Sequence, residues 1–133
     1  MNILKVLTDQ RIKGDIAESA VCKYLKKRRY KILCRNYVSS GHEIDIIAEN
    51  KEYISFVEVK SRSEGSKNPY GMRPADAVDY QKRKSIITAA RVFCAANYGK
   101  KKYRFDVAEV FLGKKSEILT INYLENAFKL DER

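Results

Sequence analysis

The stretch Glu43–Arg62, EIDIIAENKEYISFVEVKSR, decides the fold that we expect for this chain. It contains two runs rich in β-branched and aromatic residues, Ile44–Ala48 and Tyr53–Lys60, and such residues favour strands. The polar segment Glu49–Glu52 between them is typical of a turn. The stretch therefore predicts a β-hairpin.

The charged residues of this hairpin occupy regular positions. Side chains of a strand alternate between its two faces, so every second residue shares a face. We therefore expect the charged residues on one face of each strand and the apolar residues on the other. In the first strand, the charged face carries Glu43 and Asp45 and the apolar face carries Ile44 and Ile46. In the second strand, the charged face carries Glu58 and Lys60 and the apolar face carries Val57 and Val59. Burying an unpaired charge is costly, so these charges need partners or a metal ion.

A hairpin register that places Asp45 beside Glu58 would bring two carboxylates and the Lys60 ammonium group together. Carboxylate oxygens are the ligands that Mg²⁺ prefers, and bound Mg²⁺ keeps several waters. The lysine can orient a water molecule or neutralise charge that develops on a phosphate. The hairpin therefore indicates a site that can hold Mg²⁺ and act on phosphate.

Asp45 and Glu58-Val59-Lys60, with twelve residues between Asp45 and Glu58, resemble the D…(E/D)-x-K signature of the restriction-endonuclease-like nucleases. More closely, the chain resembles the YraN family of bacterial proteins, which is related in fold to archaeal Holliday-junction resolvases. The matching stretches are Gly14-Asp15-Ile16-Ala17-Glu18, Asn36-Tyr37, Glu43-Ile44-Asp45-Ile46-Ile47-Ala48, Phe56-Val57-Glu58-Val59-Lys60-Ser61-Arg62 and Arg104-Phe105-Asp106-Val107. At His42 the chain departs from the family, which more often has glycine there.

This resemblance implies an α/β fold, with a restriction-endonuclease-like mixed sheet and a central hairpin flanked by helices. It implies a metal-dependent endonuclease that hydrolyses phosphodiester bonds in DNA, with branched DNA as a candidate substrate. Asp45 and Glu58 would bind Mg²⁺ or Mn²⁺. Glu18 would complete or support the acidic shell, and Lys60 would position the attacking water. The likeness to junction resolvases also implies a homodimer, whose two-fold symmetry would match two nicks in a branched substrate.

Two other functions stay open at this stage. The chain could bind nucleic acid without hydrolysing it on its own, or it could be a structural partner in a larger repair or uptake assembly. The residues do not distinguish DNA from RNA. Cleavage that requires Mg²⁺ and is lost in Asp45→Ala would favour the enzyme.

Length and composition predict one domain over residues 1–133, and the resemblance implies that this domain is nuclease-like. The chain is 44% hydrophobic and 33% charged, and no apolar stretch approaches the length of a membrane span, so we expect a cytoplasmic protein with no membrane partner. Its 27 basic residues exceed its 17 acidic ones, which gives a net charge of +10. This excess, together with an acidic metal-type cluster, favours a nucleic acid partner. Three scattered cysteines argue against a disulfide framework and a zinc site.

The remaining segments predict two helices and three further strands. We expect helices from Thr8 or Asp9 to about Arg29 and from about Ala75 to Asn97, with Pro74 in the first turn of the second. We expect strands at Tyr30–Val38, Tyr103–Leu112 and Glu117–Tyr123, and a loop at Ser63–Arg73 beside the site.

Several charged residues of these segments have two interpretations. Glu18 lies beside the apolar stripe of the first helix, where it either pairs with Arg11 or Lys23 or reaches toward the hairpin. Residues Arg62, Lys67 and Lys82 are candidates for phosphate contact, although each would also be ordinary surface chemistry. Lys82 matches a lysine common in the resembled family. His42 is more typical of a turn or surface residue than of a catalytic one.

Overall fold

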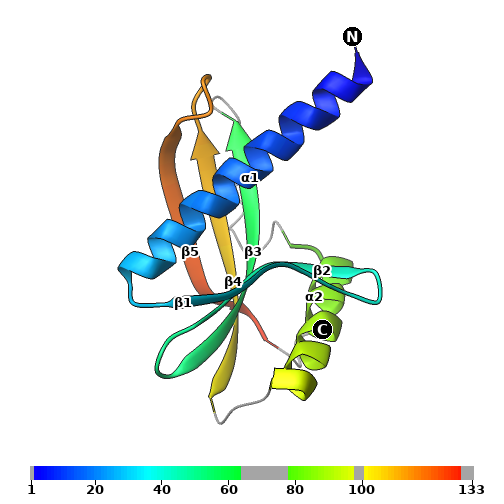
Figure 1. The fold of residues 1–133 in the computed structure, drawn as a ribbon, viewed down its shortest axis with the longest axis vertical. Helices are drawn as coiled ribbons and strands as arrows, with labels where there is room; N and C mark the ends of the chain where they lie inside the picture. The colour runs from blue at the N-terminus through cyan, green and yellow to red at the C-terminus, as the bar shows by residue number, and fades with distance from the viewer. Residues whose placement is uncertain (1, 64–77, 98–100, 130–133) are drawn as a thin grey trace.

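A computed structural model of the chain describes residues 2–63, 78–97 and 101–129. Within these residues, five strands form a mixed sheet in the order β1-β2-β3-β4-β5, accompanied by two helices (Figure 1). The elements are α1 (Ile3–Lys27), β1 (Lys31–Ser39), β2 (His42–Glu49), β3 (Tyr53–Ser63), α2 (Tyr80–Asn97), β4 (Lys102–Leu112) and β5 (Ile118–Phe128). Only the β3–β4 pair is parallel. The predicted α/β class is confirmed, and the arrangement is compatible with a nuclease-like fold.

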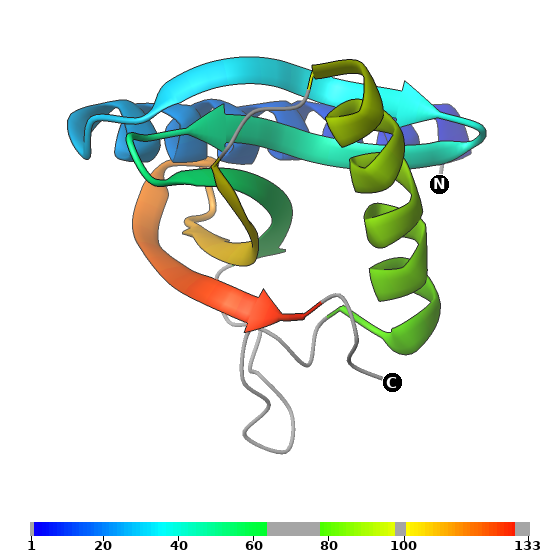
Figure 2. The same ribbon diagram turned by 90° about the horizontal axis from the view of Figure 1, so that it is seen from below.

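The core is divided between the two faces of the sheet. On one face α2 packs over large side chains of the strands, in a cluster that includes Phe56, Ile86, Phe93, Phe105 and Phe128. On the other face α1 packs over smaller side chains, in a cluster that includes Ala17, Val21, Leu25, Val57 and Ala108. In Figure 2, α2 lies apart from α1 and runs past the β1–β2 hairpin. The sheet therefore separates two helical layers.

The predicted central hairpin is present as β2 and β3. The two strands pair antiparallel, with Ile46 opposite Val57 and Glu49 opposite Ile54. Asn50 closes the turn, since its Oδ1 accepts hydrogen bonds from the backbone nitrogens of Glu52 at 2.9 Å and Tyr53 at 2.7 Å. An asparagine side chain that bonds to the backbone shortly after it commonly stabilises turns.

The first helix begins earlier than the sequence predicted. Asn2, rather than Thr8 or Asp9, caps α1, and its Oδ1 accepts a hydrogen bond from the backbone nitrogen of Leu4 at 2.9 Å. The first buried residue of the helix is Ala17, and Figure 1 shows the N-terminal turns of α1 extending beyond the strands. The early turns therefore form through local capping and hydrogen bonding, without packing on the sheet.

Two other predicted boundaries need correction. The second helix begins at Tyr80 rather than near Ala75, because Asp79 caps it and Oδ1 of Asp79 accepts from the backbone nitrogen of Lys82 at 2.8 Å. Val78 is buried but precedes the helix, while Pro74 lies outside the described residues. The last strand continues to Phe128, because its later residues pair with β4 and Phe128 itself is buried.

The strict alternation expected in β2 is also wrong. Ile44 packs in the α2 cluster, whereas Ile46 packs in the α1 cluster, so these two residues lie on opposite faces of the sheet. On β1, Asn36 has a φ of +52° and lies between the pairs Arg35–Ile46 and Tyr37–Ile44. The left-handed residue of β1 therefore lies beside the point at which β2 changes face.

No helix of the described residues combines the length and the low charge that crossing a membrane requires. Cys22 is buried, while Cys34 and Cys94 are half-buried, and all three are free thiols.

Candidate functional site

Glu58 has the most deeply buried carboxylate of the predicted site. Its side chain is only 5% exposed, and Oε1 lies 3.6 Å from Nζ of Lys60 and 3.7 Å from Nζ of Lys82. Within the described residues, the buried Oε2 has no hydrogen-bond partner. Oε1 of Glu58 therefore lies near two ammonium groups, while Oε2 accepts no hydrogen bond among the described residues and the Asp45 carboxyl lies within hydrogen-bond reach of Glu58.

Asp45 lies next to Glu58. The paired part of the β2–β3 hairpin ends at Ile46 and Val57, and Asp45 and Glu58 are the next residues on the two strands. Oδ2 of Asp45 accepts a hydrogen bond from the backbone nitrogen of Val59 at 2.8 Å, so this carboxylate reaches across to β3. Burial, and after it the charge of Asp45, raises the pKa of Glu58 to about 7, although Lys82 and Lys60 act in the opposite direction.

Glu18 approaches the same region from α1, on the face of the sheet that this helix covers. Its side chain is 13% exposed, and Oε1 lies 3.5 Å from a guanidinium nitrogen of Arg35. Burial raises the pKa of Glu18, the charge of Asp45 raises it further, and Arg35 lowers it. Among the described residues, Glu18 thus forms its ion pair with Arg35, and not with Arg11 or Lys23, which one interpretation of the sequence expected.

Beside Glu18 lies a cavity of about 530 Å³ between α1 and the β1–β2 hairpin. It is lined by Arg11, Gly14, Asp15, Glu18, Asn36 and Glu43. With the Asn36 amide turned so that its nitrogen faces the acids, Nδ2 donates to Oε1 of Glu43 at 3.1 Å and to Oε1 of Glu18 at 3.2 Å. The acidic residues of α1 and β2 are therefore joined through one amide.

The residues predicted to contact phosphate have different surroundings. Lys82 lies in the site, against Glu58. Arg62 pairs instead with the buried carboxylate of Glu109, with Nε 3.2 Å from Oε2, and it is 39% exposed. Lys67 and the loop that carries it lie outside the described residues. His42 is joined to α2, since its Nδ1 lies 2.5 Å from Oγ of Ser85.

Sequence reasoning missed the buried carboxylate of Glu109. Glu109 is 3% exposed and lies opposite Lys60 in the parallel β3–β4 pair. The sequence contained a signal for it. Phe105, Val107 and Glu109 are every second residue of β4, so their side chains share a face, and Phe105 and Val107 belong to the α2 cluster. An acidic residue at the next position of that series was a candidate for a buried ion pair.

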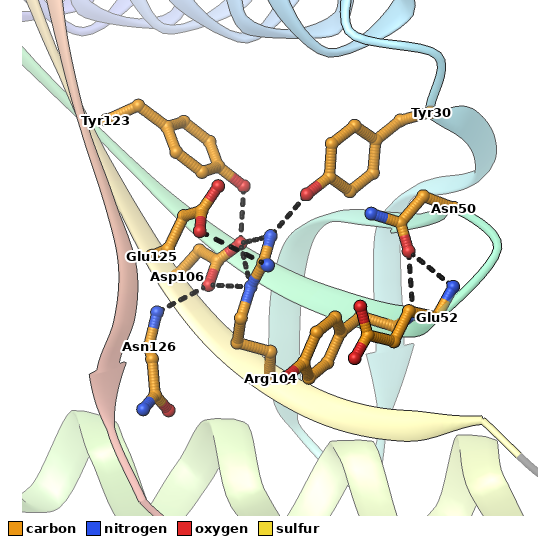
Figure 3. Close-up of polar contacts among 9 residues, drawn as sticks. Tyr30, Asn50, Glu52, Arg104, Asp106, Tyr123, Glu125 and Asn126 are labelled. Atoms are coloured by element: carbon orange, nitrogen blue, oxygen red, sulfur yellow. Dashed lines mark hydrogen bonds and ion pairs between the residues drawn. The ribbon is translucent and has the colours of Figure 1, made fainter.

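A second buried polar cluster surrounds Asp106, on the face of β4 that carries α1. Asp106 is completely buried and accepts hydrogen bonds from Nε of Arg104 at 2.9 Å, the hydroxyl of Tyr123 at 2.6 Å and the backbone nitrogen of Asn126 at 2.9 Å. Figure 3 shows Tyr123 and Tyr30 pointing toward the Arg104–Asp106 pair from two sides. Burial, followed by the charge of Asp106, raises the pKa of Tyr123. Asp106 of β4 is thus paired with Arg104 and bonded to Tyr123 and Asn126 of β5, so the cluster links β5 to β4.

The donor set of Asp45 and Glu58 fits a hard divalent cation. Among the described residues no group of three or more His, Cys, Asp or Glu side chains is arranged to hold a metal ion. Mg²⁺, however, is commonly bound through one or two carboxylates, with waters and substrate phosphate as its other ligands. The unpartnered Oε2 of Glu58 beside Asp45 meets that requirement.

Comparison with known proteins identifies the family. Residues 17–110, which include Glu18, Asp45, Glu58 and Lys82, match the family described as "Uncharacterised protein family UPF0102". The chain is 43% identical over 121 residues to UPF0102 protein CA_C1763 of Clostridium acetobutylicum, which covers 88% of this chain and 93% of that protein. It is 38% identical over 117 residues to UPF0102 protein TTE1452 of Caldanaerobacter subterraneus subsp. tengcongensis, covering 86% and 93% respectively. A match across most of the chain in both comparisons shows that the protein belongs to the UPF0102 family.

Proposed function

We propose that this protein is a metal-dependent endonuclease that hydrolyses phosphodiester bonds in DNA, with branched DNA as its candidate substrate. One observation carries the proposal: Glu58, buried beside Asp45, has an oxygen without a partner among the described residues, while two lysines approach its other oxygen. A buried carboxylate in this state is costly unless a proton neutralises it or a cation binds it, and a bound cation keeps it ionised. The resemblance of Asp45 and Glu58-Val59-Lys60 to the D…ExK signature agrees with this chemistry.

Asp45 and Glu58 would hold Mg²⁺ or Mn²⁺ through Oε2 of Glu58 and the Asp45 carboxylate. When bound, such an ion polarises a phosphoryl oxygen and lowers the pKa of a bound water. Glu18, whose pKa is raised by burial and by the charge of Asp45, would support the acidic shell. Its carboxylate is held by Arg35 and Asn36, so it adds negative charge to the site without lying free in solvent.

The two lysines act on the phosphate and on the water. Lys60 is half-buried, and its ammonium group can donate a hydrogen bond that orients the attacking water. Lys82, from α2, approaches the same carboxylate oxygen and can neutralise charge on the phosphate during attack. Water then adds to phosphorus as the leaving oxygen departs, which leaves one phosphomonoester end and one hydroxyl end.

The charge of the protein supports nucleic acid as the substrate. The net charge of +10 favours a polyanion, and the acidic site would repel phosphate if it were not offset by cations. The mixed sheet with its flanking helices is compatible with a nuclease-like fold, which is the fold that the resemblance to junction resolvases implies. We extend that resemblance to the assembly and propose a homodimer, which sedimentation equilibrium would test.

A second candidate is a nucleic-acid-binding protein with no hydrolytic activity of its own. Lys60 and Lys82 already neutralise one oxygen of Glu58 without a metal ion, which favours this alternative. In that case the cluster would serve as a basic and acidic surface for nucleic acid within a repair or uptake assembly.

The deciding experiment incubates wild type, Asp45→Ala and Lys60→Ala with linear, flapped and four-way DNA and with matching RNA, in Mn²⁺ or in EDTA. The nuclease proposal expects cleavage by wild type in Mn²⁺ and none by either variant or in EDTA. Binding that ignores metal and both substitutions, with no cleavage, supports the binding protein. Affinity should fall steeply with salt because phosphate contacts release counterions, and a protein that binds neither DNA nor RNA at low salt would overturn both.

A further inference from the structure

Asn36 is a left-handed residue in the interior of a strand. Its φ of +52° occurs near the middle of β1, between the pairs Arg35–Ile46 and Tyr37–Ile44, which places it opposite Asp45. Few residues other than glycine adopt this conformation, and asparagine is among those that tolerate it best. The strand therefore has an unusual backbone geometry at the position facing a candidate metal ligand.

The alternation of side chains changes on both strands at this point. On β2, Ile44 packs toward α2 and Ile46 toward α1, although regular alternation would place them on one face. On β1, Cys34 and Tyr37 both pack toward the α2 cluster, although regular alternation would separate them. Asp45 lies at the change of face, so its carboxylate is near both Val59 of β3 and Glu18 of α1.

The side chain of Asn36 joins two further acids. With the amide turned so that its nitrogen faces the acids, Nδ2 donates to Oε1 of Glu18 at 3.2 Å and to Oε1 of Glu43 at 3.1 Å. Glu18 belongs to α1 and Glu43 to β2, so one amide holds carboxylates from two elements. An amide nitrogen has two donor hydrogens, which matches these two acceptors.

We propose that Asn36 is a positioning residue of the acidic site: its left-handed backbone directs Asp45 to the junction of the two sheet faces, and its amide holds Glu18 and Glu43 beside it. The inference rests on the proposed metal-dependent function. Groups that hydrogen-bond to the carboxylates around a metal fix their orientation, and their loss typically weakens metal binding about 10- to 100-fold. Asn36 would not itself contact the metal ion or the substrate.

The first test removes the amide but keeps the backbone. Asn36→Gly retains a residue that adopts positive φ freely. The control is Asn126→Gly, because Asn126 also has positive φ (+55°) in a strand, is exposed, and contributes only its backbone nitrogen to Asp106. The quantity to measure is the Mn²⁺ concentration that gives half of the metal-induced rise in melting temperature. For Asn36→Gly we expect this concentration to be about 10-fold or more above that of wild type, because loss of a residue that hydrogen-bonds to metal ligands typically weakens metal binding by at least that factor. Asn126→Gly should match wild type.

The second test separates backbone from side chain. Asn36→Ala and Asn36→Gly both lack the amide, but only alanine is strained at positive φ. Asn36→Ala should melt at a lower temperature than Asn36→Gly in EDTA. Equal melting temperatures of the two variants would overturn the backbone part of the inference.

The third test does not depend on metal or on the folding of any Asn36 variant. In EDTA, the NMR signals of the Asn36 side-chain amide should shift in Glu18→Gln and again in Glu43→Gln, and unchanged signals in both would overturn the bridge. A wild type that does not respond to Mn²⁺ would overturn the proposed function, while the amide signals still decide the bridge. A wild type that responds, with Asn36→Gly responding at the same Mn²⁺ concentrations, would overturn the positioning role alone.

Discussion

Lys82 of α2 places its Nζ 3.7 Å from Oε1 of Glu58 in β3, on the carboxylate that Lys60 also approaches. The helix that follows the hairpin in the chain thus contributes a charge to the centre of the candidate site. The sequence predicted Lys82 as a candidate phosphate contact and did not predict its approach to Glu58.

This relationship predicts that Lys82 affects chemistry more than binding. Lys82→Ala should lower the single-turnover cleavage rate by about 100-fold, the usual effect of removing one group that stabilises transition-state charge. Its affinity for DNA should change little. The matched control is Lys84→Ala on the same helix, where Lys84 is exposed and lies over the ring of Tyr80. Equal effects of the two variants on binding and on rate would make Lys82 an ordinary phosphate contact.

Lys60→Ala should abolish cleavage and leave folding and DNA binding largely intact. The side chain is half-buried at the site and contributes charge rather than core packing. Cleavage assays, circular dichroism and DNA titrations would measure the three properties. Lys101→Ala is a suitable control, because Lys101 also forms an ion pair, with Nζ 2.8 Å from Oε2 of Glu49. If Lys60→Ala cleaves as wild type does, the D…ExK assignment is wrong.

Asp45→Asn should be no less stable than wild type in EDTA, and more stable by about 1 kcal/mol, the size of one pKa unit. The charge of Asp45 disfavours the ionised form of Glu58, while the asparagine oxygen can still accept from the backbone nitrogen of Val59. The variant should lose the stabilisation that Mn²⁺ gives to wild type. Thermal melts with EDTA and with Mn²⁺ test both statements, and a clear loss of stability in EDTA would make Asp45 a structural partner instead.

The metal-free protein should lose stability as pH rises from 4.5 toward 7. The pKa of Glu58 is raised from 4.5 to about 7 in the fold, chiefly by burial and then by Asp45, so the folded state favours the protonated form. That contribution is fully present below pH 4.5 and is lost as pH rises through about 7, by an amount on the order of 3 kcal/mol at most. Urea unfolding in EDTA at several pH values would measure it. Glu58→Gln should remove this part of the pH dependence, and an unchanged profile would contradict the assignment.

Within the Asp106 cluster, substitution of a buried residue should lower the free energy of unfolding more than substitution of an exposed one. Asp106→Asn leaves the buried Arg104 without its buried counter-charge and should cost about 3–5 kcal/mol. Tyr123→Phe removes one hydrogen bond to that carboxylate and should cost about 1.5–3 kcal/mol. Glu125→Gln is the control, because Glu125 is 63% exposed and its pair with Arg104 should contribute about 1 kcal/mol or less. Chemical denaturation would give the order, and a Glu125 effect as large as that of Asp106 would contradict it.

The sequence by itself determined the hairpin and the local part of the site. Apolar runs on both sides of a polar turn predicted β2 and β3, because strand propensity and turn chemistry act over a few neighbouring residues. Glu58 and Lys60 share a face because they are two residues apart on one strand, and the structure places their charged groups 3.6 Å apart. The start of α1 was missed because one asparagine cap decided it, and such caps are hard to recognise where several candidates are close together.

Only the tertiary structure decided how distant acids and cations meet at the site. Lys82 reaches Glu58, and Glu18 reaches the surroundings of Asp45, because α2 and α1 pack on opposite faces of the sheet, an arrangement that no local pattern encodes. The left-handed conformation of Asn36 was equally hidden, since asparagine is common in turns and its type does not reveal positive φ within a strand. Backbone twist and long-range packing are properties of the whole fold. They, rather than residue spacing, bring Glu18, Asn36 and Asp45 together.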